Sequence, residues 1–302
     1  MRFDVDETKP FPWIAEPRPA PRADSADRPL LHLLLLAMTA LTTTMAGARM
    51  AGVAPTSLWS LAAGLPFSVT LLAILVTHEA GHYVMCRRHG IAASLPYVLP
   101  APPIFLLGTF GAVIRIRSRF PNRRALFDMG AAGPWAGFVV ALVAMVVGLR
   151  LSSVDASLPA GPVVMLGDSL LTSFLARVVL HAPPDTVMLH PVAFAAWAGL
   201  LVTSLNLLPA GQLDGGHVLY AARGRRAVLL PLLLVTVLVW LAVTGSPFWI
   251  LWSVIAAAML FLGHPPTMND GQPLDRWRQV GAVLSLVLFL VTFVPQPIRI
   301  VP

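Results

Sequence analysis

Charged residues are scarce in this chain. They make up 12% of its 302 residues, whereas soluble domains carry about 25%. Hydrophobic residues make up 57%, and they gather in separate runs that approach or exceed the roughly 18 residues needed to cross a bilayer. This composition excludes an ordinary soluble domain and predicts an integral membrane protein that has the lipid bilayer as its surroundings.

Cysteine and glutamate are nearly absent as well. The single cysteine, Cys86, excludes an internal disulfide and a metal site built from cysteines. After residue 16, Glu79 is the only glutamate. The net charge of +7 comes from arginines between the apolar runs, which is a bias typical of cytoplasmic loops. We therefore expect no nucleic-acid partner.

The apolar runs predict about seven transmembrane helices in an all-α, multi-pass fold. We expect these helices at residues 30–48, 64–87, 126–149, 188–208, 227–244, 247–263 and 279–295. Arginines cluster in three of the connections, at residues 87–124, 223–226 and 276–278. The positive-inside rule places these clusters on the cytoplasmic side, with the N-terminus inside and the C-terminus outside.

Two further segments are predicted not to span. The polar, proline-rich leader, residues 1–29, lacks the compact basic region of a signal peptide, so we expect a disordered leader and a retained first span. Residues 161–181 are moderately apolar but contain Asp168 and Arg177. A span here would move the second arginine cluster outside, so we expect an interfacial or re-entrant helix in an external loop.

A metal-ligand pattern lies inside the second predicted span. Residues 77–83 read Thr-His-Glu-Ala-Gly-His-Tyr, and on a helix His78 and His82 lie on one face and can reach one metal ion. Glu79 can take a proton from a zinc-bound water, whose pKa the metal lowers to about 7. Ionisable side chains are costly inside a bilayer, so this pattern predicts a zinc site rather than packing residues.

A catalytic zinc needs a third protein ligand and an open position for water. Asp214 is the strongest candidate, because a proline and three glycines in residues 206–216 break the preceding span around it. Irregular backbone at this depth is tolerated where it lines protein or a water-filled cavity. His217 is an alternative ligand, although an interfacial histidine with a hydrogen bond fits it better. We expect Asp128 to be a charge at a helix N-terminus.

Residues 108–120 predict a small β-hairpin at the membrane surface. From Ile114 through Ile116 onward, apolar residues alternate with arginines, which is the period of a half-buried strand. Gly108 and Gly111 permit a tight turn before it. We expect this strand to bind an extended substrate segment as an additional strand; a basic loop that holds lipid headgroups is the alternative.

Together these motifs resemble those of the site-2 proteases, intramembrane zinc metallopeptidases of peptidase family M50. The resemblance rests on His-Glu-Ala-Gly-His at residues 78–82, Gly-Pro-Trp-Ala-Gly at 133–137 and the segment 206–216. It covers a three-helix catalytic core, residues 64–220, and it implies that the remaining helices surround this core.

The resemblance also implies a role for each matching residue. His78, His82 and Asp214 would be the ligands of one zinc ion per chain, and Glu79 would be the general base. Asn206 would steady the substrate carbonyl or the oxyanion, whereas the residue alone suggests a hydrogen bond between helices. The substrates would be transmembrane or membrane-associated proteins, cut within the bilayer in regulated intramembrane proteolysis.

Segments outside the core resemble one branch of this family. Residues 108–118 and 263–278 are similar to segments of members that lack a PDZ domain and are related to plant plastid proteins, and residues 150–190 hold no run long enough for that domain. We expect His264 to order a loop rather than to bind metal. The chain then divides into a leader (1–29), a first transmembrane helix and loop (30–63), the catalytic core (64–220) and C-terminal transmembrane helices (221–302).

These features together predict a multi-pass protein of the bacterial inner membrane, with its active site toward the cytoplasmic side. A membrane metal transporter is the main alternative, since ionisable side chains inside spans also mark ion paths. A single compact cluster disfavours it. A catalytically inactive zinc-binding homologue is the second alternative, and the intact Glu79 and Asp214 argue against it.

Overall fold

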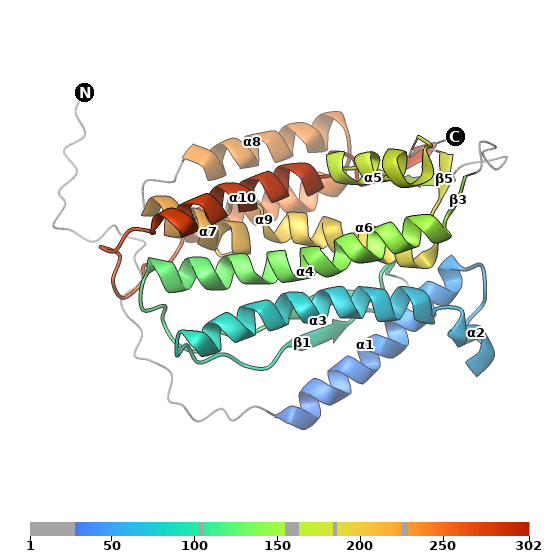
Figure 1. Cartoon of the computed structure of the whole chain (residues 1–302), viewed down its shortest axis with the longest axis horizontal. Coiled ribbons are helices and arrows are strands. Elements are labelled where there is room, and N and C mark those ends of the chain that lie inside the picture. The colour runs from blue at the N-terminus through green and yellow to red at the C-terminus, as the bar shows by residue number, and fades with distance from the viewer. Residues whose placement is uncertain (1–27, 103–104, 155–162, 184–185, 225–228, 302) are drawn as a thin grey trace.

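The computed structural model describes residues 28–102, 105–154, 163–183, 186–224 and 229–301. It is a helical bundle with short two-stranded sheets (Figure 1). Its helices are α1 (Pro29–Met50), α2 (Leu58–Ala62), α3 (Leu65–Arg88), α4 (Arg123–Leu151), α5 (Leu170–Leu180), α6 (Pro191–Asn206), α7 (Asp214–Arg223), α8 (Leu229–Thr244), α9 (Phe248–Leu262) and α10 (Arg276–Thr292). Its strands are β1 (Tyr97–Pro100), β2 (Thr109–Val113), β3 (Ser153–Val154), β4 (Val163–Leu166), β5 (Val187–Met188) and β6 (Ile298–Val301). The predicted leader lies almost entirely outside the described residues.

Each of the predicted helices is present, with bounds shifted by a few residues. Among the described residues, α1, α3 and α4 are long and apolar enough to cross a membrane, whereas α6, α8 and α9 are shorter apolar helices. The count of seven spans therefore stays a prediction. In the segment 161–181, α5 has 11 residues. A helix of that length reaches about 17 Å, short of the roughly 30 Å bilayer core, which agrees with the expectation that this segment does not span.

Helices α3, α4 and α6 pack against one another, and small residues bring them close. A Cβ on Gly148 of α4 would lie 2.5 Å from the Cα of Ala193 in α6. A Cβ on Gly199 of α6 would lie 2.8 Å from side-chain atoms of Ile74 in α3. Close approach through small residues is a common means of holding helices together in a membrane, where the hydrophobic effect between them is weak. This three-helix core holds the motif helix α3.

The predicted hairpin exists, but its second strand was misplaced. β1 and β2 pair antiparallel, with Tyr97 opposite Val113, so β2 ends before the arginine alternation begins. Past β2 the pairing continues irregularly, with Ala93 opposite Ile116. The prediction failed because β2 is defined by its pairing with the preceding strand β1, which includes Gly111 opposite Leu99. The β3–β5 and β4–β6 pairs were not predicted, so the fold is mostly helical rather than all-α.

Polar side chains of α1 hold the outer edge of β1. The His32 ring lies with Nδ1 3.1 Å from the carbonyl oxygen of Pro96, and the Thr39 hydroxyl donates to the carbonyl of Val98 at 3.0 Å. Both carbonyls face away from β2, because alternate residues of a strand direct their polar groups to opposite sides. The remaining edge of the hairpin is therefore the one along β2, and β2 contacts α3.

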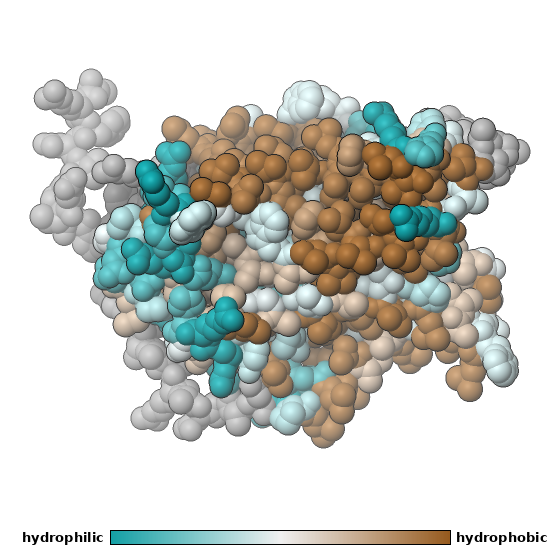
Figure 2. Space-filling view, in the orientation of Figure 1, coloured by the Kyte–Doolittle hydropathy of each residue, from teal (hydrophilic) through white to brown (hydrophobic). Residues whose placement is uncertain are grey.

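The three basic clusters meet at one end of the bundle. Arginines occupy the last turn of α3 and of α7 and the first turns of α4 and α10, and Figure 1 shows these helix ends side by side. Figure 2 shows hydrophilic residues gathered at that end, with apolar surface over much of the rest. This arrangement is consistent with a membrane protein that has one basic face, and it supports grouping the clusters on the same side.

Asp128 does not act as a charge at a helix N-terminus, contrary to the prediction. It lies in the second turn of α4 and accepts two hydrogen bonds from the Arg278 guanidinium, at 2.7 Å each. Its second partner is His89 Nε2, at 2.8 Å. The side chains come from the ends of α10, α4 and α3, so this cluster ties three helices together at the basic end. The sequence separates Asp128 and Arg278 by 150 residues, so local patterning could not show the pair.

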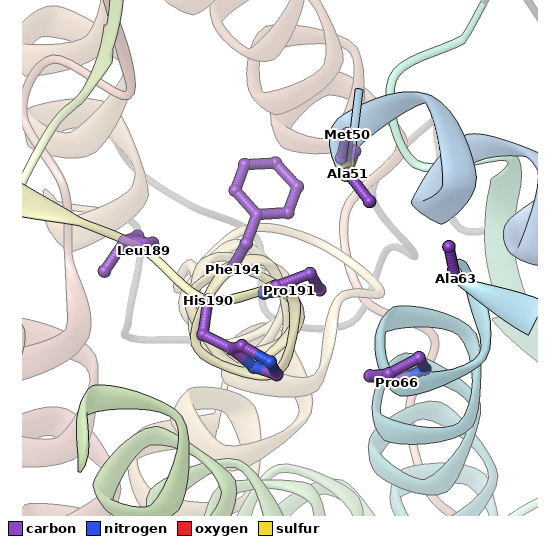
Figure 3. A pocket seen from close by; sticks show the side chains of 8 residues that line it. All are labelled: Met50, Ala51, Ala63, Pro66, Leu189, His190, Pro191 and Phe194. Carbon is purple, nitrogen blue, oxygen red and sulfur yellow. The ribbon is translucent and has the colours of Figure 1, made fainter. Parts of the chain in front are cut away.

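A cavity of about 400 Å³ lies at the opposite end of α3. Its walls include Met50 at the end of α1, Pro66 at the start of α3 and Phe194 in α6 (Figure 3). Pro66 and His78 are 12 residues apart on one helix, about 18 Å along its axis. This cavity is therefore separate from the predicted zinc site.

Candidate metal centre

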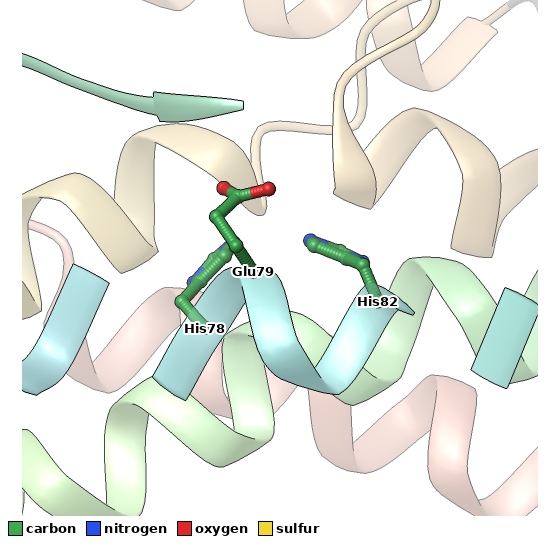
Figure 4. Close-up of side chains that lie close together, drawn as sticks. All are labelled: His78, Glu79 and His82. Carbon is green, nitrogen blue, oxygen red and sulfur yellow. The ribbon is translucent and has the colours of Figure 1, made fainter. Parts of the chain in front are cut away.

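The motif helix α3 brings its three ionisable residues together inside the protein. His78, Glu79 and His82 are buried, at 4%, 6% and 4% exposure. One ligand atom from each lies within 4.8 Å of the others, and Figure 4 shows all three side chains on the same side of the helix. The spacing of the two histidines, one helical turn apart, produces this convergence. Such a group can hold a metal ion.

Asp214 reaches the same point from another part of the chain. Its Oδ2 lies 3.2 Å from Nε2 of His78 and 3.3 Å from Nε2 of His82. The predicted break in the span is present, since α6 ends at Asn206 and α7 begins at Asp214. A Cβ on Gly215 would overlap the carbonyl of Leu207, so glycine is needed where α7 starts against the end of α6. The break between α6 and α7 thus places the Asp214 carboxylate next to the two histidines.

The orientation of His82 shows that this donor set suits a cation. Nδ1 of His82 is 2.8 Å from the carbonyl oxygen of Met129. A carbonyl only accepts, so a neutral His82 carries its proton on Nδ1 and directs a bare lone pair at Nε2 toward Asp214. Two acceptors 3.3 Å apart repel unless a proton or a cation lies between them. Tetrahedral zinc with bonds of about 2.0–2.1 Å separates its ligand atoms by about 3.3 Å, so the donor set fits zinc.

Glycines let α4 approach the metal-binding face of α3. A Cβ on Gly81 would lie 2.5 Å from the backbone oxygen of Ala132, so α4 backbone fills the space that this glycine leaves. A Cβ on Gly133 would overlap the His82 imidazole ring. A Cβ on Gly137, one turn later, would lie 3.1 Å from the Cβ of His78. The predicted Gly-Pro-Trp-Ala-Gly motif therefore places its two glycines against the two histidines.

Asn206 lies at the edge of this group. It is the last residue of α6, and its side-chain Nδ2 is 3.3 Å from Nε2 of His78. The amide therefore faces the metal-binding atoms, and the contact is also a hydrogen bond between α6 and α3, as the residue alone suggested. Its position is compatible with contact to a substrate carbonyl near the metal.

The predicted substrate-binding residues of the hairpin differ in their distance from the metal-binding group, and Ile114 is the one that contacts it. Gly108, at φ 68°, faces α1, because its carbonyl accepts from the Thr42 hydroxyl at 2.7 Å. Gly111, at φ 97°, lies inside β2 and has open space where a Cβ would be. Ile114 is the hairpin residue that meets the site, since its backbone contributes a hydrogen bond to Glu79. Figure 4 shows a strand passing close to Glu79.

Some features of the site had no signal in the sequence analysis. The Met129 carbonyl is a backbone group and carries no residue signature. His217 was expected to form a hydrogen bond, and its partner proves to be His264, with Nδ1 of His217 2.7 Å from Nε2 of His264. The spacing of 47 residues gives no local hint of this pair.

Comparison with known proteins agrees with these motifs. The model for peptidase family M50 matches residues 66–229. The chain is 34% identical over 239 residues to "Probable zinc metalloprotease EGY1, chloroplastic" of Oryza sativa subsp. japonica, which covers 76% of this chain and 40% of that protein. It is 33% identical to the EGY1 protein of Arabidopsis thaliana, with 77% and 43% covered. It is 29% identical to "Probable zinc metalloprotease EGY2, chloroplastic" of Arabidopsis thaliana, with 78% and 42% covered.

These matches cover much of this chain but less than half of each relative. The chain spans about two fifths of the length of these relatives, and no solved structure matches it. The family match covers more than half of the chain and includes α3, α4, α6 and α7, which carry the clustered residues. The chain belongs to peptidase family M50.

Proposed function

We propose that this protein is an intramembrane zinc metalloprotease that hydrolyses peptide bonds of transmembrane or membrane-associated proteins. One observation carries the proposal: two histidines of an apolar helix and an aspartate 132 residues beyond His82 present their donor atoms 3.2–3.3 Å apart. The names of the similar plant proteins, which are probable zinc metalloproteases, support the choice of metal and reaction.

Each residue of the site has its own role in peptide-bond hydrolysis. His78, His82 and Asp214 hold one zinc ion per chain. A bound zinc ion would supply Lewis acidity at this point. Glu79 lies beside the ligands, accepts the proton of the attacking water on its carboxylate, and then donates it to the leaving amine. The Asn206 amide lies 3.3 Å from Nε2 of His78 and donates to the substrate carbonyl oxygen.

The open edge of the hairpin holds the substrate in an extended form. A transmembrane helix keeps its carbonyls in hydrogen bonds, so the segment to be cut must first unwind. The N–H groups of Arg115 and Arg117 donate into the hairpin, to Ser94 Oγ and the Ala92 carbonyl. Alternation then directs the N–H groups of Ile114 and Ile116 to the open edge. There the Ile116 N–H is offered to a substrate strand, while the Ile114 backbone bonds to Glu79.

Proline at position 116 tests this strand. We expect Ile116→Pro to lower cleavage of a model transmembrane segment by about fivefold, as expected for one lost hydrogen bond of about 1 kcal/mol. Zinc content should not change, because Ile116 contacts no ligand. Ile114→Pro should also lower turnover, but the Ile114 backbone contacts Glu79, so position 116 is the cleaner test.

Two controls accompany this prediction. Ile116→Ala keeps the backbone N–H and should cleave at close to the wild-type rate. Arg117→Pro removes a bond inside the hairpin, to the Ala92 carbonyl, and should disturb the hairpin itself. Equal turnover in Ile116→Pro and the wild type would rule out substrate binding at this edge.

The position of the basic end indicates how the protein lies in the membrane. We propose that the protein is a multi-pass integral membrane protein of about seven spans, with the basic end and the metal centre toward the cytoplasmic side. His82 lies six residues from the end of α3, about 9 Å from the basic end. The similar plant proteins are chloroplastic, so they do not support the bacterial inner membrane as the compartment.

Zinc analysis and cleavage of a model transmembrane segment by the purified full chain test the function. We expect one zinc per chain, loss of cleavage when a chelator removes it, and recovery when zinc is returned. A zinc-binding protein that cleaves no such segment would be an inactive homologue. Zinc transport into vesicles without cleavage would favour a transporter.

A further inference from the structure

Helix α7 carries Asp214 at its first position, and packing against α4, α10 and a neighbouring loop, rather than local capping, holds it in place. It has ten residues, and Leu213, its N-cap residue, forms no side-chain cap bond within the described part of the chain. Helices this short are marginal on their own. The direction of the Asp214 side chain therefore depends on what packs against α7.

One loop, residues 264–270, packs on α7 through two side chains. His217 and Tyr220 lie three and six residues after Asp214, so the three side chains project from the same side of the helix. Nδ1 of His217 is 2.7 Å from Nε2 of His264. The Tyr220 ring stacks on His264 with centroids 4.2 Å apart and planes at 18°, and its hydroxyl donates to Asp270 at 2.6 Å.

The loop is itself held by the segment that leads into α4. The backbone N–H of Met268 donates to the carbonyl of Phe120 at 2.9 Å, and that of Asn269 donates to Pro121 at 3.0 Å. Inside the loop, Asp270 accepts from the backbone and the hydroxyl of Thr267. α4 begins directly after this segment and carries the Met129 carbonyl that holds His82. The loop thus joins the helix that bears Asp214 to the helix that orients His82.

The contact between the two histidines has a defined direction. Nδ1 of His264 lies 2.7 Å from the carbonyl oxygen of Pro265, which only accepts, so this nitrogen carries the proton. Burial lowers the pKa of His264 to about 4, so the ring is neutral near pH 7 and its Nε2 accepts the N–H of His217. A chain of two hydrogen bonds then runs from α7 to the loop backbone and fixes the rotation of the His217 ring.

We propose that the loop 264–270 is a positioning element of the metal centre: through His264 and Asp270 it holds α7 at the rotation that directs Asp214 to His78 and His82. This inference rests on the proposed role of Asp214 as a zinc ligand. His264 and Tyr220 are positioning residues in this scheme, and neither touches the metal or the substrate.

The test measures metal binding by the full chain in detergent. Competition with a chelator gives the zinc affinity, and the visible spectrum of the cobalt-substituted protein reports the ligand geometry. We expect His264→Ala to weaken zinc binding about 10–100-fold, the usual effect of losing a group that orients a ligand, and to alter the cobalt spectrum. His264→Gln should restore much of both, because its side-chain oxygen can accept the His217 N–H.

Matched variants keep the result interpretable. His181→Asn replaces an exposed histidine at φ 53° after α5 with a residue that tolerates that conformation, and it should match the wild type. Tyr220→Phe removes the hydroxyl bond to Asp270 and keeps the ring that stacks on His264, so it should weaken zinc binding by a smaller factor, even if His264→Ala does not fold. Wild-type zinc affinity and cobalt spectrum in both folded His264→Ala and Tyr220→Phe would overturn the proposal.

Asp214→Ala separates this inference from the function on which it rests. If Asp214→Ala binds zinc as tightly as the wild type, the proposed ligand set is wrong. If Asp214→Ala loses zinc while the loop variants do not, the ligand set stands and the loop has no positioning role.

Discussion

Glu79→Gln is expected to abolish measurable cleavage of a transmembrane segment and to leave the zinc content unchanged. The amide has the size of the carboxylate but cannot accept the proton of the attacking water. Proton transfer by a placed side chain accounts for about 10²–10⁴-fold in rate, and the loss should reach that range. Glu79 is buried beside the ligands but is not assigned as one, so zinc analysis should show one ion per chain. Cleavage of a fluorogenic or gel-resolved substrate measures the loss.

The same variant separates a protease from a transporter. A transporter requires ligands that bind and release the ion, and it does not need a base for water, so zinc flux into vesicles would continue in Glu79→Gln. Zinc loss in Glu79→Gln would instead assign Glu79 as a ligand, which its position within 4.8 Å of both histidines permits. Full cleavage by this variant contradicts the proposed mechanism.

Gly133→Ala is expected to remove zinc almost as completely as His82→Ala, although it adds one methyl group outside the ligand set. The new Cβ would overlap the His82 ring. The ring cannot retreat without losing the Met129 carbonyl bond that directs its Nε2 toward Asp214. Overpacking of this kind also costs about 1–3 kcal/mol of stability. Zinc content, measured on protein that elutes as a folded species, gives the result.

Gly137→Ala, one turn along the same helix, provides the graded comparison. Its Cβ would lie 3.1 Å from the Cβ of His78, a contact that a shift of a few tenths of an ångström relieves. We expect partial zinc loss at most. Equal zinc content in Gly133→Ala and the wild type would show that His82 does not need its present rotamer to bind metal.

The features of this site that depend on local spacing could be predicted from the sequence. His78 and His82 are four residues apart, and helical geometry alone brings them together. Asp214 is distant in sequence, yet the proline and glycines around it mark the helix break that exposes it. Asn206 and the two glycines of α4 were recognised through the family resemblance and not through their own physics.

The missed features are contacts between distant segments. The Met129 carbonyl, the His217–His264 bond and the Asp128–Arg278 pair each join elements that local patterns treat separately. β2 was misplaced because the alternation of arginines reports exposure, whereas the strand is defined by its pairing with β1. The number of spans is also not fixed by local apolar length, since several apolar helices are shorter than a bilayer crossing requires.

The side chains that α1 presents to β1 also limit how the hairpin can associate. A two-stranded sheet with both edges free is a template for further strands on either side, which is a route to aggregation. His32 and Thr39 occupy two carbonyls of one edge, so growth on that side is blocked. If substrate binds as an added strand, as proposed above, it can therefore add at one edge only, the one along β2.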